Sequence, residues 1–286
     1  MWAGLPFRYV RGSEADAPLR ILFFTDVHSM LEKAVPEKLR ETAKLISETP
    51  FDLVIGGGDF VHGGFQSTRE AMKPRFQIAA DFLGWIGHPV EAVLGNHDMV
   101  GVRPDDGSEP ESDTTADFRA LTGVSELWRR FDRNGYRIFI LQSIQPVSTA
   151  ERYHGRIADE QLIWLKTELE NTPRNMPLIV CTHIPFRTTF IQAKEGPNVA
   201  LAPNLVVQNA NDVLTLFENH RLILVLQGHL HVNESIRWNQ TEFLMGGAVS
   251  GSWWNGPNLG TPAGFGIVAL GDPNRAFWEY QSIDAS

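Results

Sequence analysis

Six apolar runs in this sequence each stop abruptly at a polar or glycine residue, and this pattern constrains the fold more than any other feature. The runs are rich in β-branched and aromatic residues and read RILFFTDVH, FDLVIGGGD, VEAVLGNHD, RIFILQS, PLIVCTH and LILVLQGHLH. Such runs, with little polar alternation, are typical of strands covered on both faces. Segments with helical spacing separate several of them: PEKLRETAKLISET, TREAMKPRFQIAADFLGWI, ADEQLIWLKTELENT and NANDVLTLFENH. The alternation predicts an α/β fold with much parallel pairing.

After His231 the helical spacing ends, and the sequence predicts successive strands in NESIRWNQ, TEFLMGGAV, GFGIVAL and RAFWEYQSI. We therefore expect a sheet that begins with helical crossovers and ends with hairpins, or two such sheets packed together. No low-complexity linker and no internal repeat interrupts the chain, so we expect one domain over residues 1–286. The acidic, turn-prone stretch at residues 103–117, RPDDGSEPESDTTAD, is interpreted as a solvated loop.

Composition narrows the function classes. The formal net charge of -9 argues against a non-specific nucleic-acid binder, which needs Lys and Arg to displace counterions from phosphates. The single cysteine, Cys181, permits neither a disulfide framework nor a thiolate metal site and is interpreted as a buried thiol. No segment reaches membrane-spanning length, so we expect a soluble, cytoplasmic protein without membrane insertion, unless a signal peptide has been removed.

Polar side chains gather where the apolar runs end. Ligands of open α/β sheets bind beyond the carboxyl ends of the strands, so these side chains are expected along one edge. Taken singly, each is more simply a helix cap or turn residue. Together they mix carboxylate, amide and imidazole, a set that suits Zn, Fe or Mn better than Ca or Mg. The residues are Asp26, His28, Asp59, His62, Asn96, His97, His183, His229 and His231.

The number of these side chains is also informative. Seven candidate ligands among these nine side chains are too many for one tetrahedral ion, but they suffice for two ions if one carboxylate bridges them. Two ions a few Å apart are the usual device for attack on phosphorus.

The motifs resemble those of the calcineurin-like metallophosphoesterases. Five blocks occur in the family's order: DVH at 26–28, GDFVH at 58–62, GNHD at 95–98, THIP with His183, and GHLH at 228–231. The resemblance implies a four-layer α/β/β/α sandwich of two mixed sheets with a dinuclear centre. It implies that one metal is held by Asp26, His28 and His231, the second by Asn96, His183 and His229, with Asp59 bridging.

The resemblance also implies roles beside the metals. His97 is expected to protonate the leaving oxygen or to contact the substrate phosphate, and Asp98 either orients His97 or contacts the loop backbone. His62 stands where the purple acid phosphatase branch has a metal-binding tyrosine, so a divalent pair of Mn, Fe(II) or Zn is expected rather than ferric iron. His62 itself is interpreted as a hydrogen-bonding loop residue, or alternatively as a substrate contact or extra ligand.

Adjacent tryptophans stand in the Gly-rich segment GGAVSGSWWNGPN at residues 246–258. Trp253 and Trp254 either belong to the core or form a wall of the substrate pocket, and similar loops in phosphodiesterase-like members of the family favour the pocket.

These features predict an enzyme that hydrolyses a small phosphodiester or phosphomonoester with a metal-bound hydroxide at a dinuclear centre. Two alternatives remain: a nuclease, for which no basic cluster is visible, and a non-catalytic metal-binding scaffold of the same fold. The sequence does not fix the substrate, the native metals or the oligomeric state.

Overall fold

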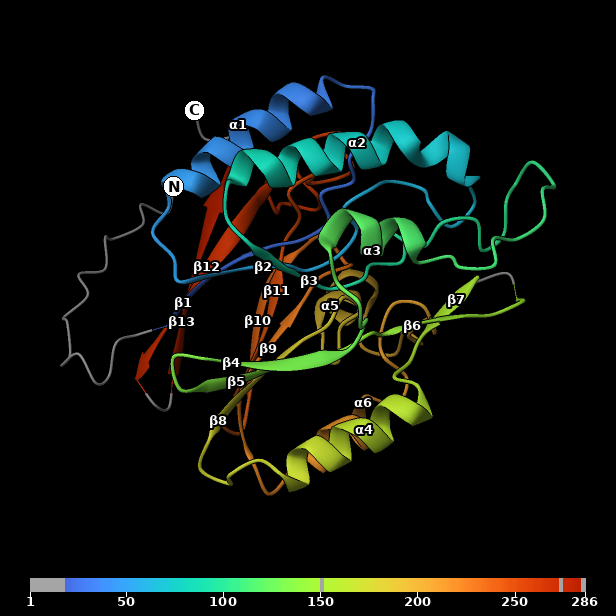
Figure 1. Ribbon diagram of the computed structural model, residues 1–286. Helices are drawn as coiled ribbons and strands as arrows, with labels where there is room; N and C mark the ends of the chain where they lie inside the picture. Colours follow the sequence, from blue (N-terminus) through green and yellow to red (C-terminus); the bar gives the residue numbers. More distant parts are fainter. Residues whose placement is uncertain (1–18, 150–151, 273–274, 284–286) are drawn as a thin grey trace.

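The computed structural model describes residues 19–149, 152–272 and 275–283 and contains two mixed β-sheets (Figure 1). The first sheet has the order β13-β12-β1-β2-β3, in which β1, β2 and β3 are parallel and the hairpin β12-β13 continues the sheet antiparallel to β1. Its strands are β1 (Leu19–Phe24), β2 (Leu53–Gly56), β3 (Val90–Ala92), β12 (Gly264–Asp272) and β13 (Arg275–Ser282).

The second sheet has the order β10-β11-β9-β8-β5-β4, with β11, β9, β8 and β5 parallel and an antiparallel strand at each edge. The four strands predicted after His231 thus form two hairpins that extend different sheets. The strands of this sheet are β4 (Arg129–Arg133), β5 (Tyr136–Ile140), β8 (Pro177–Cys181), β9 (Arg221–Gln227), β10 (Asn233–Trp238) and β11 (Thr241–Gly246), and a separate hairpin joins β6 (Ile144–Pro146) to β7 (Tyr153–Gly155).

Helices cover the outer faces of both sheets, which gives the predicted four-layer sandwich. Figure 1 shows α1 and α2 above the strands and α4 and α6 below them. Alternate residues of β1 face opposite ways: Ile21 and Phe23 pack between the sheets, whereas Leu22 and Phe24 pack with the helical layer. The helices are α1 (Val35–Glu48), α2 (Arg69–Ile86), α3 (Ala116–Thr122), α4 (Asp159–Glu170), α5 (Phe190–Glu195) and α6 (Ala210–Leu216). None of the helices described is long and apolar enough to cross a membrane.

The structure confirms the buried cysteine and shows which contacts the acidic loop makes. Cys181 is fully buried between the sheets, where burial raises the pKa of its thiol. The acidic stretch 103–117 is a solvated loop over residues 105–110, which are exposed, but it is also tied to α2: Arg69 pairs with Glu111 at 3.3 Å and with Asp117 at 2.9 Å, and α3 begins inside the stretch. Long-range ion pairs, which the local sequence does not reveal, hold this segment against α2.

Candidate metal centre

All seven predicted metal ligands lie just beyond the carboxyl ends of neighbouring strands. Three segments follow β1, β2 and β3 of the first sheet, and two follow β8 and β9 of the second, so the candidate site lies where the two sheets meet. Five of the seven have backbone φ angles between 46° and 77°, a left-handed conformation that costs a non-glycine residue roughly 1–3 kcal/mol. These sharp bends turn side chains off the strand direction. The five are Asp26, His28, Asp59, His229 and His231.

One set of ligand atoms converges beside the end of β1. The Nε2 atoms of His28 and His231 are 3.0 Å apart, and Asp26 Oδ1 is 3.4 Å from the second and 3.8 Å from the first. Ligands held about 2.0–2.2 Å from one ion are separated from each other by roughly 3–3.5 Å. The three side chains therefore form a set that could hold one metal ion.

A second set lies next to the first and shares a carboxylate with it. His183 Nε2 is 3.1 Å from Asn96 Oδ1 and 3.3 Å from Asp59 Oδ2, and His229 belongs to the same cluster. The same Asp59 Oδ2 atom is 3.6 Å from His28 Nε2 in the first set. Asp59 is therefore placed to touch ions in both positions.

The electrostatics of the cluster suit a cation. Asp26 Oδ2 accepts hydrogen bonds from Thr25 Oγ1 and the His229 amide, whereas its buried Oδ1 has no hydrogen-bond partner. Although burial opposes protonation of His183, the Asp59 carboxylate raises the pKa of that imidazole to about 9. Buried carboxylates thus draw positive charge into the cluster, and the orphaned Asp26 oxygen is satisfied if a cation binds.

Backbone carbonyls orient three of the four imidazoles. His183 Nδ1 donates to Gly57 O at 2.8 Å, His231 Nδ1 to Gly251 O at 2.6 Å, and His229 Nε2 to Asn204 O at 2.9 Å. A carbonyl accepts only, so the proton of each ring is on the bonded nitrogen. In the neutral form of each ring, which a metal ligand requires, the other nitrogen has its lone pair toward the cluster.

Gly95 permits a close approach of the loops. A Cβ atom there would lie 2.1 Å from the Asp59 amide nitrogen and 2.2 Å from Asp59 Oδ1, both far inside contact distance. Its φ is not positive, so the glycine is required by proximity rather than by a special turn.

His97 and Asp98 have separate environments. Gly63 N donates to His97 Nδ1 at 2.8 Å, so the proton of the neutral ring is on Nε2. Asp98 instead accepts backbone N–H bonds from Gly95, Asp59, Phe60 and Val61 at 2.7–3.2 Å, and no hydrogen bond recorded for Asp98 reaches His97. Burial and the Asp59 charge raise the pKa of Asp98 to about 7, although these N–H groups favour its ionised form. The carboxylate ties the loop after β3 to the loop after β2.

His62 is half-buried and lies beside His28 and His97. Its Nδ1 is 3.3 Å from His28 Nδ1, and its ring is stacked on His97 with centroids 5.1 Å apart and an interplanar angle of 19°. Burial, with the charges of His97 and Arg75, lowers the pKa of His62 to about 4. The ring is therefore neutral at neutral pH.

The adjacent tryptophans point in different directions. Trp254 is buried in the core, and its Nε1 donates to His28 O at 3.1 Å, so this ring is no pocket wall. Trp253 is 40% exposed, and the centroid of its ring lies 4.5 Å from the centroid of the His231 ring. Lys33 Nζ fixes the loop by donating to Trp253 O at 3.0 Å and to Asn255 Oδ1 at 2.7 Å.

Sequence reasoning missed two residues next to His229. Tyr153, from β7, has its ring 6.2 Å from the His229 ring and hydrogen bonds to the side chain of Asn204. Asn204 also supplies the carbonyl that orients His229. Neither residue stands in a motif, and the backbone acceptor of Asn204 leaves no side-chain pattern in the sequence.

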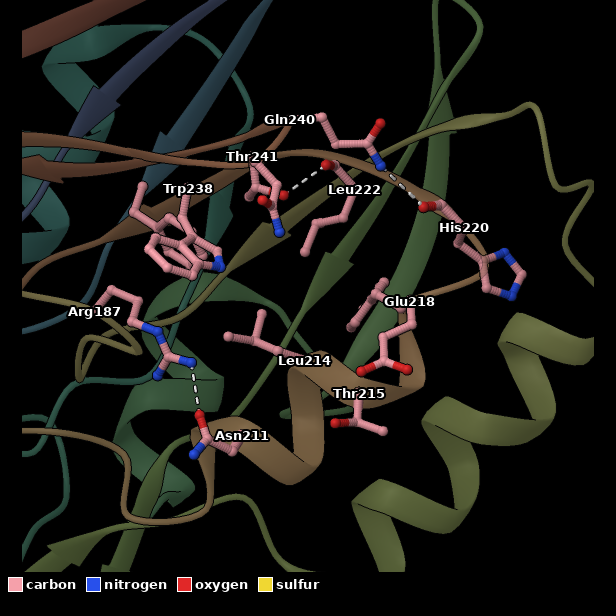
Figure 2. A pocket seen from close by; sticks show the side chains of 13 residues that line it. Arg187, Asn211, Leu214, Thr215, Glu218, His220, Leu222, Trp238, Gln240 and Thr241 are labelled. Carbon is pink, nitrogen blue, oxygen red and sulfur yellow. Dashed lines mark hydrogen bonds between the residues drawn. The ribbon is translucent and has the colours of Figure 1, made fainter.

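A separate pocket of about 340 Å³ lies between α6 and the β10-β11 turn (Figure 2). Its lining includes Leu214, Trp238 and Arg187, all labelled in Figure 2. Arg187 Nη2 donates to Asn211 Oδ1 at 2.7 Å. None of the predicted site residues lines this pocket.

The fold and the candidate site together define a class, the α/β/β/α sandwiches with candidate metal ligands at the strand ends. The chain belongs to the calcineurin-like phosphoesterase family, whose model matches residues 19–233. Membership supports metal-dependent hydrolysis of phosphoesters as the general activity. No curated protein sequence matches the chain significantly.

Solved structures share the fold at low sequence identity. A dimetal phosphatase from Danio rerio superposes with a TM-score of 0.64 at 14% identity, covering 93% of this chain and 96% of its own. The phosphopantetheinyl hydrolase PptH from Mycobacterium tuberculosis gives 0.51 at 13% identity, covering 82% and 91%. GAP50, described as the anchor in the inner membrane complex of Plasmodium, gives 0.54 at 11% identity, covering 94% and 85%. The same fold thus occurs in proteins described as enzymes and as an anchor.

Proposed function

We propose that this protein hydrolyses a small phosphate ester, either a phosphodiester or a phosphomonoester, at a dinuclear centre of divalent transition metals. The observation that carries the proposal is the shared Asp59 Oδ2 atom, 3.6 Å from His28 Nε2 and 3.3 Å from His183 Nε2. One buried carboxylate oxygen between two nitrogen-rich ligand sets is the arrangement that a bridged pair of ions needs. When bound, such a pair supplies Lewis acidity and activates water.

The donors also limit the metals. Imidazole nitrogens, carboxylates and one amide oxygen, with no thiolate, suit Mn, Fe(II) or Zn. Asp26, His28 and His231 would hold one ion, and Asn96, His183 and His229 the other. With Asp59 shared, the ligands carry two negative charges, so two divalent ions leave a net positive centre. That local charge attracts an anionic phosphate to a protein whose formal net charge is -9.

His97 would act on the substrate as a hydrogen-bond donor. Its Nδ1 is occupied by the Gly63 amide, so only Nε2–H is available for a phosphoryl or leaving-group oxygen. A hydrogen-bond donor that is already positioned in a buried site is worth more there than in water and needs no reorganisation during the reaction. Direct hydrogen bonding to the phosphate therefore suits this geometry better than protonation by an imidazolium.

Trp253 would bind the organic part of the ester. Its exposed ring beside His231 is a flat apolar surface at the edge of the metal cluster. Such a ring stacks on a base, a sugar face or a lipid headgroup, so the substrate class is a phosphate ester with a flat or apolar substituent.

A metal and substrate screen tests the proposal. Purified protein is reconstituted with Mn, Zn or Fe(II), its metal content is measured, and hydrolysis of phosphomonoesters, cyclic nucleotides, nucleotide conjugates and phospholipid headgroups is compared. We expect two ions per chain and hydrolysis of at least one small ester. Two bound ions with no turnover on any ester would favour the scaffold, and turnover restricted to polymeric DNA or RNA would favour the nuclease.

A further inference from the structure

Each ligand histidine of the proposed centre has an outer ring nitrogen, which faces away from the cluster. The partner of this outer nitrogen is different in His28 from that in the other three histidines. His183, His229 and His231 each donate their outer ring N–H to a backbone carbonyl. The outer nitrogen of His28, Nδ1, instead lies 3.3 Å from Nδ1 of the His62 side chain. His28 is thus the one ligand histidine among the described residues whose outer partner can be removed without changing the backbone.

The direction of this hydrogen bond follows from the other end of the His28 ring. His28 Nε2 faces the cluster, 3.0 Å from His231 Nε2 and 3.6 Å from Asp59 Oδ2. A metal ligand needs its lone pair there, so the His28 proton is on Nδ1, and His62 Nδ1 must accept it. The proton of the His62 ring is then on Nε2.

The His62 ring is held firmly enough to orient its neighbour. Its backbone nitrogen donates to Ser29 O at 3.2 Å, and the Arg75 guanidinium of α2 donates to its carbonyl. One face of the ring is stacked on His97 at 5.1 Å. The side chain therefore cannot turn away from His28 without disturbing the residue that is proposed to meet the substrate.

We infer that His62 is a positioning residue that accepts the Nδ1–H of His28 and thereby aims His28 Nε2 at the first metal. The inference rests on the proposed dinuclear centre. It assigns to an imidazole the part that a carboxylate or carbonyl usually plays behind a metal-bound histidine. His62 then acts through His28 on metal binding and touches neither the ion nor the substrate.

Two nearly isosteric substitutions test this role. In His62→Asn the Oδ1 atom takes the position of the lost Nδ1 and can accept from His28, whereas His62→Leu puts a methyl group there. Because losing an outer partner typically weakens metal affinity roughly 10–100-fold, we expect His62→Leu to lose about that factor for one of the two ions. His62→Asn should retain wild-type affinity for both. Chelator competition with Mn or Zn measures the two affinities, and kcat and KM are recorded for the same samples.

Control variants separate positioning from a general structural effect. His88→Leu changes an exposed histidine on the turn after α2 and should alter neither affinity. His62→Gln carries its amide one carbon further out, away from the Nδ1 position, so it should behave like His62→Leu and serves if the leucine variant does not fold.

Three results would overturn the inference. Unchanged affinity for both ions in His62→Leu and His62→Gln would show that His62 does not support His28, and a rise in KM alone would make it a substrate contact instead. If the wild-type protein binds no transition metal, the proposed centre itself is wrong and the inference falls with it. A difference between variants is therefore read only against a wild type that binds two ions.

Discussion

The metal cluster and the pocket of Figure 2 are opposite kinds of site. The pocket is hollow, open and of mixed polarity, and its guanidinium, that of Arg187, already bonds to Asn211. The cluster is tightly packed, and five of its ligands have a left-handed backbone. One buried carboxylate oxygen, Asp26 Oδ1, has no hydrogen-bond partner, and the pKa of His183 is raised to about 9. Free volume is therefore a poorer guide to the chemistry of this protein than converging lone pairs, which are costly to bury unless a cation joins them.

Removing the shared carboxylate should have the largest effect. Asp59→Ala takes a ligand from both sets, so we expect loss of both ions and of about 6 kcal/mol of transition-state stabilisation, roughly 10⁴-fold in kcat/KM. Metal analysis and hydrolysis assays on the same sample measure it. Asp81→Ala, at an exposed position on α2, is the matched control and should keep both ions. If the Asp59→Ala protein still holds two ions, Asp59 is not their shared ligand, and the cluster does not differ from the pocket in the way described above.

Changing His97 should separate catalysis from metal binding. His97→Ala removes the Nε2–H donor, and loss of one such donor typically lowers kcat roughly 10²–10³-fold. Metal content should stay at the wild-type value, because His97 is assigned no ion. If the rate does not change, His97 is not the donor, whatever its position in the cluster.

The two tryptophans should respond differently although they are adjacent. Trp254→Ala empties a buried site and removes the bond to His28 O, so we expect about 3–5 kcal/mol lower stability in denaturant unfolding. Trp253→Ala should leave stability nearly unchanged and raise KM up to roughly tenfold, as expected for a lost aromatic contact of about 0.5–1.5 kcal/mol. The reverse pattern would place Trp254, not Trp253, against the substrate.

The smallest effect is expected in the pocket of Figure 2. Trp238 is 68% exposed, and Trp238→Ala should shift stability by no more than about 0.5 kcal/mol and leave kcat and KM unchanged. Steady-state kinetics on the ester chosen by the screen measure this. A change of tenfold or more in kcat/KM would show that the pocket belongs to the working site.

Much of the architecture is predictable because it depends on local pattern. The apolar runs that form β1, β2, β5, β8 and β9 are long enough to be recognised, and the spacing of the four main helices is clear. The sequence did not predict β4, the short β6-β7 hairpin, α3 or α5. Such elements bury little surface of their own, and contacts with distant parts of the chain stabilise them.

By itself the sequence determined the inventory of the candidate site: which carboxylates, imidazoles and amide follow which strands, and in what order. Side-chain chemistry and strand ends are local properties, so a single chain reveals them. Only the tertiary structure decided which atoms meet. It placed Asp59 Oδ2 between two sets of nitrogens, Asp98 on backbone amides, Trp254 in the core and His62 behind His28. Those outcomes depend on bends, ring orientations and backbone acceptors contributed by residues far apart in the chain, and no local pattern records them.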